Sequence, residues 1–171
     1  MMTLKDLLHS RRAAIQKRWL EKTLETYAPD ATAFFERQKD QFANPVGQAL
    51  RAGTQTMVDC LLDEMDAEKI CSALEEIVKI RSIQDFTPAQ AVSFVFSLRP
   101  VIREELKGEL DAARLVELAQ FEARIDQLAL FAFDVYVKCR ERLYEIRVNE
   151  VKRSVSGLMR RLNREEEKAQ S

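Results

Sequence analysis

The fold class follows from residues 111–166, which read DAARLVELAQFEARIDQLALFAFDVYVKCRERLYEIRVNEVKRSVSGLMRRLNREE. This stretch has no proline, Gly157 is its one weak helical position, and Asp111 can cap its amino end. A helix of about 50 residues would be ~75 Å long, which exceeds the size of a domain built from this chain. We therefore predict an all-α protein whose last helix protrudes at its carboxyl end.

The apolar pattern of this stretch changes near Ile146. Before that residue the apolar positions form a wide band, which is typical of a helix packed on several neighbours. Beyond it they narrow to a seam spaced four, three and four residues, as in a coiled coil. The seam consists of Val151, Val155, Leu158 and Leu162. Because a seam needs a partner helix, we predict a helical domain over residues 1–146 and an interaction segment over residues 147–171, paired either with a second copy or with another protein.

The preceding 110 residues also favour helices. Four glycines and four prolines are too few for the turns of a many-stranded sheet. Amphipathic spacing and cap residues predict helices over about residues 4–27, 31–42, 45–65 and 66–83, with Asp30, Asn44 and Asp66 as caps. A further helix should begin after Thr87, continue through a kink at Pro100, and end before Gly108.

Composition indicates a soluble, cytoplasmic protein. Lys and Arg total 27 against 28 Asp and Glu, so the formal net charge of −1 does not attract nucleic acid or anionic lipid. No stretch reaches the roughly 18 apolar residues of a membrane span, and no secretory signal is present. The three cysteines form no CxxC motif and are expected to be reduced core residues. The nine phenylalanines lie on apolar helical faces and are expected in the core.

Catalytic, metal and cofactor sites are not expected. His9 is the only histidine, so one chain cannot form a His pair, a His–carboxylate dyad or a His/Cys metal site. No glycine-rich phosphate loop is present. Adjacent carboxylates such as Glu75 and Glu76 point in different directions on a helix, so they cannot act together on one substrate.

Two polar segments, residues 37–47 and 81–86, contain a possible ligand or junction cluster. Its members are Arg37, Asp40, Asn44, Arg81 and Asp85. An arginine beside a helix start could receive a small anion, while the alternative is a helix junction tied by ion pairs and caps.

The last helix is also basic, with six cations and one acid between Arg147 and Arg164. Such a helix could bind nucleic acid phosphates or an acidic protein. Since no aromatic residues are interleaved for base stacking, nucleic acid is the weaker interpretation. The alternative function is therefore a helical binding module that uses this basic segment.

Three segments carry a family resemblance: RQKDQFANPVG at 37–47, IVKIRSIQDFTPAQA at 77–91 and YEIRVNEVK at 144–152. Over about residues 4–152 the chain resembles the RsbRD amino-terminal domains, the sensor part of RsbT co-antagonist-like bacterial proteins. The resemblance implies a globin-like helical bundle without haem and a non-enzymatic signal-input role. It also implies frequent dimerisation and transmission of a state along the last helix to an output domain.

We therefore expect a bacterial sensor or regulatory domain that forms a homodimer, binds no haem, and presents its last helix to an unknown signalling protein. The sequence continues only about 20 residues past the resembling region. The output domain is accordingly expected in another protein, or the domain acts alone.

Overall fold

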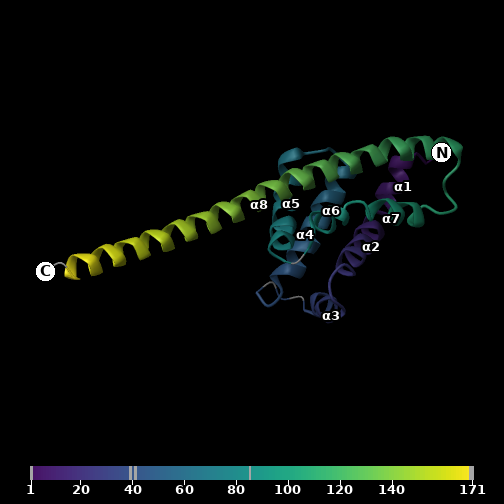
Figure 1. Ribbon diagram of the computed structural model, residues 1–171. Helices are drawn as coiled ribbons and strands as arrows, with labels where there is room; N and C mark the ends of the chain where they lie inside the picture. The colour runs from purple at the N-terminus through teal and green to yellow at the C-terminus, as the bar shows by residue number, and fades with distance from the viewer. Residues whose placement is uncertain (1, 39, 41, 85, 170–171) are drawn as a thin grey trace. The chain divides into compact units, whose positions relative to one another are not determined.

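Within residues 2–38, 40, 42–84 and 86–169, which the computed structural model describes (side chains to residue 165), the regular structure is entirely α-helical (Figure 1). The helices are α1 (Leu4–Ser10), α2 (Arg12–Leu24), α3 (Pro29–Arg37), α4 (Pro45–Leu62), α5 (Ala67–Ile83), α6 (Pro88–Ser93), α7 (Leu98–Glu105) and α8 (Ala112–Ala169). The predicted all-α class with a long last helix is confirmed. The globin-like relation and the protrusion of the last helix stay predictions.

The chain forms two compact units, Met1–Tyr136 and Val137–Ser171. Helix α8 contributes residues to both units. The functional boundary predicted at residue 146 stays a prediction. No helix among the described residues is long and apolar enough to cross a membrane.

The first unit is built around α4, which packs against both α2 and α5. The approach of α4 to α5 is close at Gly53, where a Cβ atom would lie 2.6 Å from Cδ1 of Ile77. Helix α2 also packs against α7, and its Trp19 side chain is fully buried. The start of α8 joins this unit through Ile125 and Leu128, which are both buried.

The predicted helix caps are confirmed with one exception. Asn44, Asp66, Thr87 and Asp111 each accept a hydrogen bond from the backbone N–H three residues later. Asp30 was expected to cap the second helix, but this is wrong: α3 begins at Pro29, whose missing N–H is not needed in a first turn. Helix α3 also ends at Arg37 and not near Phe42. Between α7 and α8 the chain turns at Gly108, whose φ of 89° is favoured only for glycine.

The single helix predicted over residues 4–27 is two helices in the structure. Arg11, with φ −99° and ψ 3°, separates α1 from α2, and its N–H bonds back to the Leu7 carbonyl. Because α1 packs on α4 while α2 packs on both α4 and α7, the break lets each apolar face meet its own neighbours. No glycine or proline marks this break in the sequence.

The kinked helix predicted around Pro100 is also two helices, α6 and α7, because the chain breaks before the proline. The turn over residues 94–97 makes i to i+3 bonds, and the Phe96 carbonyl accepts from the Arg99 N–H at 3.2 Å. Pro100 therefore lies in the first turn of α7, where its missing N–H causes no bend. The expectation that all phenylalanines lie in the core is wrong for the exposed Phe34, Phe42, Phe96 and Phe133.

Candidate functional site

The most unusual buried group is Arg81 of α5, which has no exposed surface. Three aromatic rings surround its guanidinium carbon, with ring centroids 5.0 Å away for Tyr27, 4.9 Å for Phe86 and 4.9 Å for Phe94. A cation facing aromatic rings at this distance is attracted by their electron-rich faces. We call these four residues the Arg81 cage.

Besides the cage rings, neutral hydrogen-bond acceptors surround the Arg81 guanidinium. Arg81 Nη1 donates to the Gln90 carbonyl at 3.2 Å, and Nη2 donates to Thr26 Oγ1 at 2.8 Å and to the Thr23 carbonyl at 3.4 Å. Arg81 Nε and the Tyr27 hydroxyl have no hydrogen-bond partner among the described residues. The structure records no ion pair between Arg81 and a described carboxylate. Burial lowers the pKa of Arg81 from its usual value and raises the pKa of Tyr27.

Asn44 holds a second buried junction, between α3 and α4. Besides capping α4, its Nδ2 donates to the carbonyls of Phe35 at 3.0 Å and Gln38 at 2.7 Å. Arg51 also donates to the Phe35 carbonyl, at 2.9 Å. The Phe35 ring meets the Tyr27 ring edge to face at 5.4 Å, which connects this junction to the Arg81 cage.

The five residues of the predicted polar cluster are thus divided. Asn44 and Arg81 are buried in neighbouring junctions, whereas Arg37 and Asp40 are exposed and Asp85 lies outside the described residues. Asp40 accepts a hydrogen bond from the Phe42 N–H at 2.8 Å. A ligand-binding role for this cluster stays a prediction.

The sequence pattern did not assign to a site Tyr27 and Phe94 of the cage, or the Arg81 acceptors Thr23 and Thr26. They lie 13 to 58 residues from Arg81 along the chain, as their numbers show. The only local signal is the density of polar groups around Arg81.

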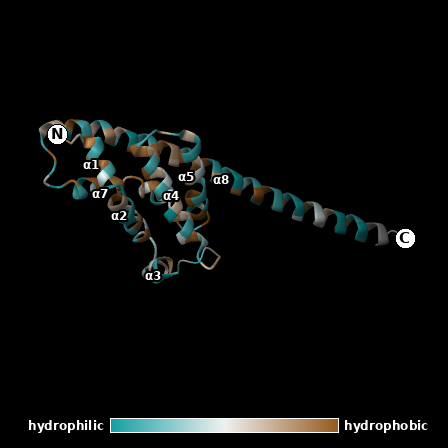
Figure 2. Cartoon of the chain, turned by 180° about the vertical axis from the view of Figure 1, so that it is seen from behind, coloured by the Kyte–Doolittle hydropathy of each residue, from teal (hydrophilic) through white to brown (hydrophobic). Residues whose placement is uncertain are grey.

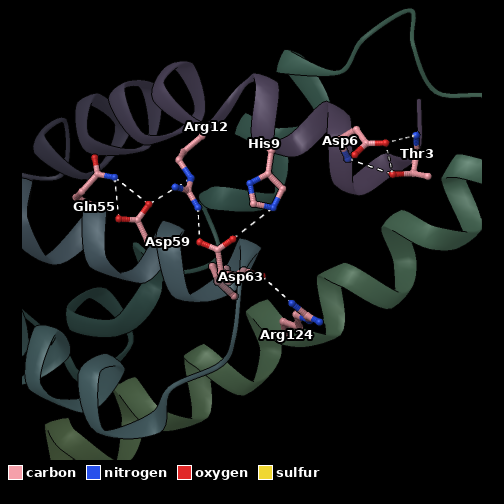
Figure 3. A network of polar contacts seen from close by, with 9 residues as sticks. Thr3, Asp6, His9, Arg12, Gln55, Asp59, Asp63 and Arg124 are labelled. Carbon is pink, nitrogen blue, oxygen red and sulfur yellow. Dashed lines mark hydrogen bonds and ion pairs between the residues drawn. The ribbon is translucent and has the colours of Figure 1, made fainter. Parts of the chain in front are cut away.

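His9 takes part in a polar network between α1, α2 and α4 (Figure 3). Its Nε2 lies 3.5 Å from Oδ1 of Asp63, which also pairs with Arg12 at 2.5 Å. Arg12 in turn pairs with Asp59 at 3.3 Å, and Gln55 donates to the same carboxylate. These contacts join the helix ends. No group of three or more His, Cys, Asp or Glu in the described part of the chain is placed to hold a metal ion.

In the second unit, the predicted seam residues are exposed. The exposed fractions of Val151, Val155, Leu158 and Leu162 lie between 52% and 62%. Tyr144 and Val148 are exposed as well and continue the same spacing of four and three toward the amino end. Hydrophobic and hydrophilic residues interleave along this part of α8 (Figure 2). The seam is therefore longer than sequence reasoning proposed, and it is uncovered within a single chain.

One comparison with known proteins gives a match: the family model described as RsbT co-antagonist protein rsbRD N-terminal domain matches residues 13–151. No curated protein and no solved structure matched the chain.

Proposed function

Because the chain belongs to the RsbT co-antagonist protein rsbRD N-terminal domain family, a family of regulatory domains and not of known enzymes, we propose that it is a non-enzymatic sensor domain acting through dimerisation and contact with a partner protein. Its setting would be the bacterial cytoplasm. The observation that carries this proposal is the apolar surface that α8 leaves exposed. Apolar side chains gathered on one exposed face favour burial against another chain.

In the first unit, the exposed apolar residues of α8 form a stripe suited to a dimer. They include Val116, Ala119, Ala123, Leu130 and Phe133, spaced three, four, seven and three residues, and also Leu115, four residues before Ala119. These spacings place them on one helical face. The opposite face supplies Leu118, Ile125 and Leu128 to the core of the unit. We assign dimerisation to this stripe and partner contact to the seam of the second unit.

Leu130→Glu combined with Phe133→Glu is expected to convert the dimer to a monomer. Burial of a Leu or Phe side chain contributes about 1.5 to 3 kcal/mol, and a symmetric dimer would lose this at both copies. The measurement is sedimentation at low micromolar concentration, with circular dichroism to verify the fold. Ala52→Glu with Ser72→Glu is the matched control, because it changes the charge equally at exposed positions of α4 and α5 and leaves the α8 stripe intact. An unchanged sedimentation coefficient for the stripe variant would contradict the proposal.

The purified protein is expected to bind no haem. A proximal imidazole must face a haem pocket, whereas the single histidine, His9, lies beside Asp63 at the junction of α1 and α4. The absorption spectrum of protein purified from cells supplied with haem tests this. A Soret band that survives purification and is lost in His9→Ala would refute the expectation.

The seam can transmit a signal to a partner helix because coiled-coil packing has discrete registers. Two such registers give two distinct output states. The rival function, a binding module for nucleic acid or an acidic protein, uses the same basic segment without the seam. Loss of partner binding after a seam substitution separates the two functions, since phosphate attraction does not depend on apolar residues.

A further inference from the structure

The seam of the second unit fits a coiled-coil heptad from Tyr144 to Leu162. Val148, Val155 and Leu162 occupy the first apolar position of successive heptads, and Tyr144, Val151 and Leu158 occupy the second. All six side chains are exposed. The segment covers fewer than three heptads, so its apolar residues alone give little affinity for a partner helix. The charges that flank the seam therefore contribute much of the affinity and selectivity.

The positions that flank this seam are mostly basic. In the heptad they are Glu145, Arg147, Lys152, Ser154, Met159 and Arg161. All six are exposed, and the structure records no ion pair between these cations and any described side chain. The flanks therefore present three positive charges between residues 147 and 161, while the one negative charge, Glu145, lies at the amino end of the seam.

A second copy of the chain does not complement these flanks. In a parallel pair Arg147 would face Lys152 of the second copy, and an antiparallel pair would place one basic flank against another. Like charges across a coiled coil oppose pairing, whereas opposite charges at these positions select the partner. A helix with Glu or Asp beside its apolar seam supplies the missing charge in either direction.

We propose that residues 144–162 pair with an amphipathic helix of a different protein, one whose apolar seam is flanked by acidic residues. This inference rests on the proposed signalling function and names the chemistry of its partner. Two further cations, Arg153 and Arg160, occupy the outer face, away from the seam. They serve as an internal control, because a polyanion attracted only by positive charge would bind to these two cations as well as to the cations beside the seam.

The test uses the full chain and two labelled synthetic peptides of about four heptads, both with Val and Leu in the seam. One peptide has Glu at every flanking position and the other has Lys. Fluorescence anisotropy is expected to show binding of the acidic peptide only, with affinity that decreases as salt is raised. Val155→Glu with Leu158→Glu is expected to weaken binding at least ~10-fold by placing charges in the seam.

The decisive comparison is between two double variants that each replace two basic residues with Glu, one beside the seam and one on the outer face. Lys152→Glu with Arg161→Glu is expected to weaken binding of the acidic peptide at least ~10-fold and to permit binding of the basic one. Arg153→Glu with Arg160→Glu, on the outer face, is expected to change affinity less than ~3-fold. Circular dichroism verifies that all variants keep the parental helical signal.

Three results would overturn the inference. If the flanking and the outer double variants lose the same affinity for the acidic peptide, the segment is attracted to polyanions in general, such as nucleic acid. Failure of the acidic peptide to bind would remove the proposed partner chemistry. Weaker dimerisation after the seam substitution would assign the seam to a second copy. Sedimentation of the Leu130 and Phe133 double variant is measured in parallel. It tests the dimer proposal alone, whereas peptide binding tests this inference, so the failure of one can be told from the failure of the other.

Discussion

Replacing Arg81 with Ala is expected to lower the free energy of unfolding by about 3 to 5 kcal/mol. The truncation empties the space between the rings of Tyr27, Phe86 and Phe94. It also removes the hydrogen bonds that Arg81 donates to the Gln90 and Thr23 carbonyls and to the Thr26 hydroxyl, although the two carbonyls keep the Ser93 and Thr26 hydroxyls as donors. The lost hydrogen bonds add to the cost of the cavity.

Two matched variants separate shape from charge at this position. Arg81→Met keeps most of the side-chain volume and removes the cation, so it should lower the free energy of unfolding by less than Arg81→Ala does. Arg81→Lys keeps the charge but not the planar fork that reaches acceptors on two sides, so it should also destabilise. Urea unfolding followed by circular dichroism measures all three. An Ala variant as stable as the parent would show that the buried cation gives the fold no net stability, and would favour the anion-binding interpretation of Arg81.

Trp19→Ala is the second substitution expected to have a large effect, a loss of about 3 to 5 kcal/mol in the free energy of unfolding. The Trp19 side chain is fully buried and stacks on Phe94 with ring centroids 6.0 Å apart. Its Nε1 donates to the Phe94 carbonyl at 2.7 Å, just where the chain leaves α6 for α7. The indole therefore fills the core and also stabilises the break between these helices.

Trp19→Phe tests the hydrogen bond more directly, with an expected loss of about 1 to 2 kcal/mol. The Phe94 carbonyl keeps one donor in this variant, the Ser97 hydroxyl at 2.6 Å. Phe96→Ala is the control, since this neighbouring ring is exposed and its removal should change stability by less than about 0.5 kcal/mol. If Trp19→Ala and Phe96→Ala unfold at the same urea concentration, the assigned role of Trp19 is wrong.

The helical class and the seam could be predicted because their causes are local. A cap such as Asn44 bonds to an N–H three residues away, and the seam repeats at short helical spacing. The basic flanks follow from the same heptad positions. Each of these features depends on residues within two turns of one helix, so the sequence contains all the information that they require.

The breaks at Arg11 and at residues 94–97, and the burial of Arg81, were decided only by the tertiary structure. Arg11 has no breaking residue beside it, and the break before Pro100 depends on Trp19, 75 residues away from Phe94. A charged residue such as Arg81 is normally exposed unless paired, and its acceptors at Thr23 and Thr26 lie 58 and 55 residues away. Local periodicity carries no information about such distant contacts. Their energy arises only when packing brings separate helices together, because burial and desolvation depend on everything that surrounds a side chain.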